Sequence, residues 1–214
     1  MPGSPIKIII TDDHPIVRRG LKQALAAETD MELIGEAQDA AVLFELFSKR
    51  SCDVLVLDIS IPGRSGLDVL KEIKSERPSL AVLVLTMHPE DQYAMRAFRA
   101  GAAGYLTKDG APTELIKAIR HIAAGGKYVT PALAERLAAY LGPDDGKLPH
   151  ESLSDREYEV LRMIASGQTV SQIADKLFLS PNTISTYRAR LLEKLNLRTT
   201  AELIHYAVIN RLMD

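Results

Sequence analysis

The chain has 214 residues, of which 46% are hydrophobic and 25% charged, a composition typical of a folded globular protein and not of a disordered one. The formal net charge of -2 excludes a protein that is basic throughout, so any nucleic-acid-binding surface must be a local patch. Cys52, the single cysteine, excludes an internal disulfide and is expected at a core or edge position. Because the apolar runs are too short for a signal core or a membrane span, we expect a cytoplasmic protein without membrane association.

The first 125 residues alternate between short β-branched runs and stretches whose apolar residues have helical spacing. Strands are predicted at 6–10, 31–37, 53–57, 80–85 and 103–106, and helices at 16–27, 40–50, 67–75, 92–100 and 113–124. Such alternation indicates a parallel sheet covered on both faces. The sequence therefore predicts a five-stranded, doubly wound α/β domain whose ligands bind at the carboxyl ends of the strands.

The pattern changes at Gly125 and Gly126, which end the fifth predicted helix. A short helix is expected over 132–141, and the polar run that follows contains glycine and proline breakers typical of a linker. Only helical patterns come after it, at 154–166, 169–177, 181–195 and 200–212. We therefore predict an α/β domain over 1–126, a linker with a short helix over 127–150, and an all-α domain over 151–214.

Polar residues follow or end four of the predicted strands. Asp12 and Asp13 follow the first, Asp58 the third and Lys108 the fifth, while Thr86 ends the fourth. Neighbouring parallel strands lie about 4.8 Å apart, so these side chains should meet in one crevice. Three carboxylates favour a hard cation such as Mg²⁺, which keeps waters that a phosphate can replace. The lysine offers a charge for a phosphoryl oxygen and the threonine a hydroxyl donor.

Asp58 is the candidate phosphoryl acceptor, because an ionised carboxylate can attack phosphorus and form an aspartyl phosphate. Residues 59–63 after it predict an irregular, accessible loop. Taken singly, each pocket residue has a structural alternative: the two aspartates after the first strand could cap the next helix, and Lys108 could be a solvated charge. The prediction depends on their joint placement at strand ends.

This ordered set of residues resembles the receiver domains of bacterial two-component response regulators. The motifs that carry the resemblance are the pair Asp12-Asp13, residues 56–63 around Asp58, Thr86, and residues 104–108. The resemblance implies that a histidine kinase phosphorylates Asp58. It also implies Mg²⁺ bound by Asp13, Asp58 and the backbone carbonyl of Ser60, with Asp12 contributing through water.

The same resemblance assigns three further roles. It makes Thr86 and Tyr105 a switch pair and Lys108 the phosphate partner. The residue after the switch threonine is usually small in receivers, whereas here it is Met87. We expect this larger side chain to alter the rates of phosphorylation or dephosphorylation without abolishing function.

A helix-turn-helix is predicted in the second domain. Thr169 and Gln172 form a capping-box pattern, a break follows at 178–180, and Ser180 caps a new helix with Pro181 at its first position. This arrangement is typical of a motif whose second helix enters the major groove of DNA. Candidate DNA contacts are Lys176, Asn182, Thr183, Ser185, Thr186, Arg188, Arg190 and Lys194. A merely solvated basic face is the alternative.

Residues 153–203 resemble the LuxR-type helix-turn-helix, through the motifs at 153–161, 172–174 and 180–187. Nearly the whole chain is thus similar to the NarL/FixJ class of response regulators. Many members carry lysine at the position of Ser185, and some at that of Ala189, but this sequence lacks both. Arg188 and Arg190 are the candidates to supply the missing charge.

The class resemblance implies a homodimer that binds paired half-sites in double-stranded promoter DNA and is favoured by receiver phosphorylation. It implies a receiver dimer face on the first and fifth helices. The candidate residues are Ile16, Val17, Ile116 and Arg120, with a core role as the alternative for the apolar ones. The last helix either pairs two copies or closes the core of the small domain.

Three other functions are disfavoured. An aspartate-based phosphatase needs a second carboxylate two residues after its nucleophile, where Ser60 stands, so we expect no enzyme beyond phosphoryl transfer to Asp58 itself. A Rossmann-like nucleotide site needs a glycine-rich turn after the first strand, where residues 11–15 hold two aspartates instead. A receiver serving only as a scaffold would not need the complete set of pocket residues.

Overall fold

The computed structural model describes residues 4–110, 112–131, 133–135 and 148–212. The chain divides into two compact units, residues 1–140 and 141–214, the first α/β and the second helical. The finer boundaries at 126 and 150 remain predictions, and the helix expected over 132–141 lies mostly outside the described residues. Among the helices that are described, none is long and apolar enough to cross a membrane.

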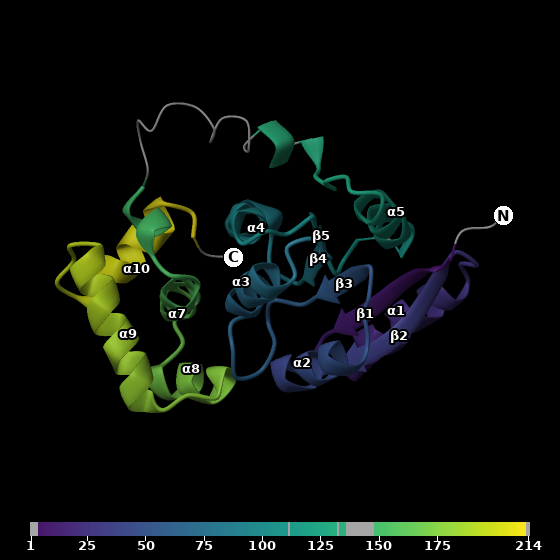
Figure 1. Cartoon of the computed structure of the whole chain (residues 1–214). Helices are drawn as coiled ribbons and strands as arrows, with labels where there is room; N and C mark the ends of the chain where they lie inside the picture. The colour runs from purple at the N-terminus through teal and green to yellow at the C-terminus, as the bar shows by residue number, and fades with distance from the viewer. Residues whose placement is uncertain (1–3, 111, 132, 136–147, 213–214) are drawn as a thin grey trace. The chain divides into compact units, whose positions relative to one another are not determined.

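The first unit holds a five-stranded sheet in the order β2-β1-β3-β4-β5, with every pair parallel, as predicted (Figure 1). The strands are β1 (Ile6–Thr11), β2 (Met31–Ala37), β3 (Val54–Leu57), β4 (Ala81–Thr86) and β5 (Gly104–Thr107). Strand order reverses between β1 and β3, and ligands of doubly wound sheets bind at such a switch point. Thr11 pairs with Leu57 there, so the residues that follow these strands emerge side by side.

Five helices flank this sheet: α1 (Pro15–Ala26), α2 (Ala40–Lys49), α3 (Gly66–Glu76), α4 (Glu90–Arg99) and α5 (Pro112–Ala123). Leu25 of α1 and Ile119 of α5 belong to one core cluster with Ile8 and Ile10 of β1, so these two helices cover one face. Helices α2, α3 and α4 lie on the other face (Figure 1). Because both faces are covered, strands such as β3 are wholly buried, which explains their continuous apolar runs.

The chain beyond α5 packs on the first unit and does not leave it at residue 126. Tyr128 forms a parallel bridge with Gly104 at the free edge of β5, and its amide donates to the carbonyl of Ala103 over 2.8 Å. The Thr130 hydroxyl donates to Glu90 at the start of α4, 2.7 Å away, and the Leu133 side chain is buried. Residues 127–131 and 133, hereafter the docked segment, therefore cover an edge of the sheet that would otherwise be open.

Over residues 148–212, the second unit contains a 3₁₀ turn and four helices: η1 (Pro149–Ser152), α7 (Asp155–Ala165), α8 (Val170–Leu177), α9 (Pro181–Lys194) and α10 (Thr200–Ile209). Both helices of the predicted helix-turn-helix begin as expected. Thr169 and Gln172 form the capping box of α8, and Ser180 caps α9 by accepting a hydrogen bond from the Thr183 amide. Helix α10 ends before the predicted residue 212, and Arg211 beyond it has a φ of 53°, which no α-helix accepts.

Candidate functional site

The predicted crevice is present at the carboxyl ends of β1 and β3. Sheet-like hydrogen bonding continues past both strand ends, because the Asp12 amide donates to the Ala37 carbonyl and the Asp58 amide to the Thr11 carbonyl. These bonds fix the two backbones next to each other. The side chains of Asp12 and Asp58 are only 1% exposed, so two carboxylates are buried in one place. Burial of that kind is costly unless each charge is compensated.

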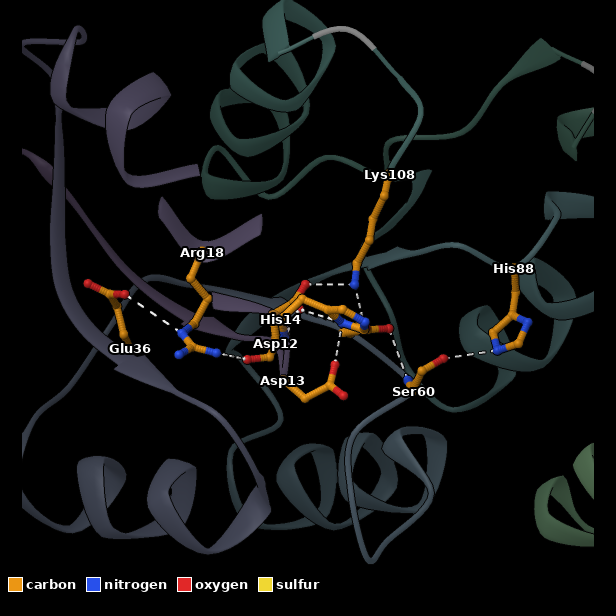
Figure 2. A network of polar contacts seen from close by, with 9 residues as sticks. Asp12, Asp13, His14, Arg18, Glu36, Ser60, His88 and Lys108 are labelled. Carbon is orange, nitrogen blue, oxygen red and sulfur yellow. Dashed lines mark hydrogen bonds and ion pairs between the residues drawn. The ribbon is translucent and has the colours of Figure 1, made fainter. Parts of the chain in front are cut away.

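Lys108 supplies the compensating charge. Its Nζ lies 2.7 Å from Asp12 Oδ2 and 2.5 Å from Asp58 Oδ2 (Figure 2). Its backbone amide donates to the Thr86 carbonyl. Burial alone would lower the pKa of Lys108. The charges and hydrogen bonds of Asp58 and Asp12 outweigh that effect and hold the pKa above its ordinary value. The ammonium group is therefore charged at neutral pH and is aimed at the carboxylate of Asp58.

The acidic group fits a hard cation. Asp12, Asp13, His14 and Asp58 each place one ligand atom within 4.8 Å of the others. Asp13 Oδ1 is buried and makes no hydrogen bond to any described residue, although the His14 ring lies 2.6 Å away. A carboxylate oxygen that is buried without a donor matches the preference of Mg²⁺ for oxygen ligands. His14 directly precedes α1, and its position among these carboxylates was not predicted.

The loop after Asp58 is shaped by two close contacts. The Ser60 amide donates to Asp58 Oδ1 over 2.9 Å, which orients the carboxylate. Gly66 at the start of α3 lies so close to the loop that a Cβ there would stand 2.3 Å from the Cα of Ile59. Only glycine fits this approach. The backbone carbonyl of Ser60 thus belongs to a loop held on both sides, and its role as a metal ligand stays a prediction.

The predicted switch residues Thr86 and Tyr105 both contact His88. The Thr86 hydroxyl accepts a 3.4 Å hydrogen bond from the His88 amide, and the Tyr105 hydroxyl donates to the His88 carbonyl over 2.9 Å. The His88 ring also reaches Ser60, with 3.0 Å between Nε2 and Oγ (Figure 2). Sequence reasoning missed His88. Its only signal was its place two residues beyond Thr86, in a loop that borders the crevice.

Two further residues support the crevice from β2 and α1, and neither was predicted. Arg18 donates to the backbone carbonyl of Asp12 over 2.5 Å and lies 3.8 Å from Glu36 (Figure 2). This contact holds the end of β1 against the first turns of α1.

Met87, the residue after the switch threonine, is 69% exposed, so its side chain points mostly to solvent. Its effect on phosphoryl transfer remains a prediction.

In the second unit, α9 presents a polar face. Ile184 and Leu191 are fully buried. The opposite face carries three exposed polar residues, Asn182, Ser185 and Thr186. Lys176, Arg188 and Arg190 are also exposed, whereas Thr183 is half-buried. Arg188 follows Ile184 by one turn and so lies towards the buried side, while Arg190 follows Thr186 by one turn and lies nearer the polar face.

Lys194 differs from the other predicted DNA contacts. Its Nζ lies 2.7 Å from Oε2 of Glu157, the capping-box carboxylate of α7, whose side chain is 4% exposed. Burial would raise the pKa of Glu157, but its bonds to Lys194 and Ser154 outweigh burial and lower the pKa. This pair ties α9 to the start of α7. Lys194 is therefore held in a structural contact while its side chain stays 43% exposed, and its contact with DNA remains a prediction.

The predicted dimer residues divide into three kinds. Ile16 is 82% exposed, which is unusual for isoleucine, and Val17 is half-buried. Ile116 is buried in the core of the first unit. Arg120 forms ion pairs with Glu28 and Asp30 of the same chain, at 2.5 and 2.8 Å. A largely apolar pocket of about 240 Å³ lies between α1 and α5, lined by Val17, Gly20, Leu21, Leu106 and Leu115 among others; Ile16 precedes Val17 but does not itself line the pocket.

Two protein families match the chain. Residues 8–120 match the response regulator receiver domain, and residues 151–207 match the luxR family of bacterial regulatory proteins. Response regulator GacA of Pseudomonas aeruginosa is 37% identical over 210 residues, covering 98% of each chain. These matches span both units described above.

Solved structures of RcsB are similar over both units. RcsB from Salmonella enterica serovar Typhimurium, bound to promoter rprA in the presence of the phosphomimetic BeF₃⁻, is 32% identical with a TM-score of 0.66, covering 95% of this chain and 98% of that one. A structure of two RcsB dimers bound to two parallel DNAs is 32% identical with a TM-score of 0.60, covering 96% and 98%. Each resembles this chain in fold and in domain order.

Proposed function

Since the chain belongs to the response regulators that join a receiver domain to a LuxR-type DNA-binding domain, we propose that phosphorylation of Asp58 by a histidine kinase controls its binding to promoter DNA. The chain is a transcription regulator and not a classical enzyme. The observation that carries the proposal is the buried pair of Asp58 and Lys108 at the switch point of the sheet, beside Asp12 and Asp13. The division at 126 and 150 is part of the same proposal, with the linker that begins at residue 127 packed along the first domain through its docked segment.

In the transfer step, one carboxylate oxygen of Asp58 attacks phosphorus and the bond between phosphorus and the kinase histidine breaks. Ser60 and Lys108 already hold the two carboxylate oxygens by hydrogen bonds, so the nucleophile is oriented before the donor arrives. Asp13, Asp58 and the Ser60 carbonyl would hold Mg²⁺, with Asp12 acting through water. When bound, the ion offsets the negative charge of the phosphoryl group. Lys108 then provides the ammonium partner of a phosphoryl oxygen.

The Thr86 and Tyr105 switch acts through His88. A phosphoryl group on Asp58 offers oxygens to which the Thr86 hydroxyl can donate, and turning towards them alters the hydrogen bond that this hydroxyl now accepts from the His88 amide. Tyr105 holds the other side of the same peptide segment through the His88 carbonyl. Movement of Thr86 therefore changes the position of the loop before α4, which is a small population shift between two arrangements.

The output is DNA binding by a homodimer. Helix α9 enters the major groove, with Asn182, Thr183, Ser185, Thr186, Arg188, Arg190 and Lys176 as the residues available at the interface. The exposed Ile16 precedes Val17, which lines the apolar pocket between α1 and α5. The proposed dimer uses this face, with two copies related by a two-fold axis each placing Ile16 against the other. Because bacterial promoter DNA lies in the cytoplasm, we also propose that the protein acts there.

Mass spectrometry after incubation with acetyl phosphate and Mg²⁺ tests the acceptor. The wild type should gain one phosphoryl group, mapped to Asp58, and Asp58→Asn should gain none. Asp53→Asn serves as the matched control, since Asp53 binds the Lys7 amide at the opposite end of β3. Phosphorylation that persists in Asp58→Asn at the wild-type level would contradict the proposal.

A further inference from the structure

Several polar side chains of α9 use their hydrogen-bonding groups within the protein. The hydroxyls of Ser180 and Thr183 lie 2.8 Å apart, and the Ser180 hydroxyl also accepts from the Thr183 amide. The Thr186 hydroxyl donates to the Asn182 carbonyl over 3.0 Å. These groups cap and close the first turns of the helix. Thr183 and Thr186 therefore have less capacity to discriminate one base from another.

Asn182 and Ser185 differ from these residues. Both are exposed, and within the described part of the chain neither the Asn182 amide nor the Ser185 hydroxyl makes a hydrogen bond. They lie three residues apart, on the face opposite the buried Ile184 and Leu191. Ala189, one turn further along this face, is small and exposed, so the middle of the helix has no long side chain to keep it away from DNA.

Charged and uncharged side chains occupy different parts of this surface. Arg190 borders the polar face, and Lys176 at the end of α8 is exposed as well, whereas Lys194 is engaged by Glu157. Long cationic side chains at the border suit phosphates, which position a protein but carry no sequence information. The uncharged centre of the face is left for base edges. A primary amide offers one donor and one acceptor together, which matches N7 and N6 of adenine in the major groove.

We propose that Asn182 is a specificity-determining residue that pairs through its side-chain amide with an adenine in each half-site, with Ser185 adding a weaker contact on the same face. This inference rests on the proposed function. It predicts a sequence preference that is set by the Asn182 amide. The same helix face has no lysine at Ser185 or Ala189 to select guanine.

Selection from a random duplex library tests the proposal with the phosphorylated full-length protein. The wild type should enrich paired half-sites that contain an adenine at one fixed position. Asn182→Ala should lose the preference at that position by roughly 5- to 150-fold, the range of one bidentate amide–base pair, with the other positions unchanged. Asn182→Asp, which is isosteric but lacks the donor, should lose it as well. Thermal unfolding of each variant verifies that the second unit still folds.

Lys176→Ala is the contrasting variant, because loss of a phosphate contact weakens all sequences alike and lowers the salt dependence. If Asn182→Ala behaves in the same uniform way, or selects the same sequences as the wild type, the proposal for Asn182 is wrong while DNA binding stands. If the wild type enriches no sequence, the proposed function itself is wrong, and the inference with it.

Discussion

At the scale of single residues, the crevice is an electrostatic balance between buried groups. Among the described residues, Lys108 carries the only positive charge within 4 Å of the carboxylate oxygens of Asp12 and Asp58, apart from the His14 ring, which is charged only when protonated. Arg18 reaches the backbone carbonyl of Asp12 instead. Breaking a buried pair leaves uncompensated carboxylates, and this costs more than the pair itself contributes. The same balance makes the crevice ready for a cation and for a phosphoryl group.

Lys108→Met should therefore destabilise the first unit. Without divalent cations we expect a loss of about 3–5 kcal/mol in the free energy of unfolding, measured by urea denaturation and circular dichroism. Mg²⁺ should restore part of the loss, because it replaces the missing charge. An unchanged urea midpoint in the absence of Mg²⁺ would show that the carboxylates do not depend on Lys108.

Glu157→Gln tests the pair that fixes α9 to α7. Glutamine keeps the capping box but loses the charge attraction to Lys194, so we expect a loss of about 1 kcal/mol at pH 7. Because the pKa of Glu157 is lowered in the folded protein, its stabilisation is present above the ordinary value of 4.5 and is lost as pH falls through the folded value. The difference in melting temperature between variant and wild type should shrink below pH 4.5. A difference that grows on acidification would contradict the assignment.

At the scale of secondary-structure elements, α4 lies between the crevice and the docked segment. His88 before this helix contacts Ser60 and Tyr105, while Glu90 in its first turn accepts from Thr130. Thr130 also accepts from the Leu133 amide over 3.2 Å. A shift of the loop before α4 therefore reaches the docked segment through direct contacts.

Thr130→Val should loosen the docked segment without altering the crevice. Valine loses two hydrogen bonds, the one to Glu90 and the one from the Leu133 amide, each worth about 1 kcal/mol. Amide exchange at residues 127–131 should therefore accelerate by roughly 30-fold in hydrogen–deuterium exchange. Thr130→Ser keeps the hydroxyl and should exchange like the wild type. Equal exchange in all three proteins would mean that Thr130 does not hold this segment.

The elements that the sequence predicted are those governed by local pattern. The strands and helices of the first unit follow from apolar periodicity, and the crevice followed from polar residues at strand ends. The contacts of His88, the pairing of Lys194 with Glu157 and the docking of Tyr128 could not be predicted, because they join side chains and backbone from elements whose mutual placement the sequence does not state. The early end of α10 was missed since Asn210 and Arg211 are ordinary helix residues by composition.

At the scale of the whole molecule, the proposed regulation requires that two copies of the chain form a dimer. Ile16→Lys should prevent phosphorylation-dependent dimerisation, because it replaces an exposed apolar side chain of the proposed dimer face with a charge. Analytical ultracentrifugation with acetyl phosphate measures this, and phosphoryl incorporation at Asp58 should be unchanged. Ile209→Lys, at an exposed isoleucine of α10, is the matched control. If only the control variant is monomeric, the interface belongs to α10 and not to α1 and α5.

The central claim is that phosphorylation of Asp58 controls DNA binding. Its most direct measurement is the affinity of wild type and Asp58→Asn for a duplex selected by the wild type, at fixed salt, with and without acetyl phosphate. The wild type should bind more tightly when phosphorylated, and Asp58→Asn should show the same affinity in both conditions. An acetyl-phosphate effect of equal size in Asp58→Asn, or none in a fully phosphorylated wild type, would contradict the account.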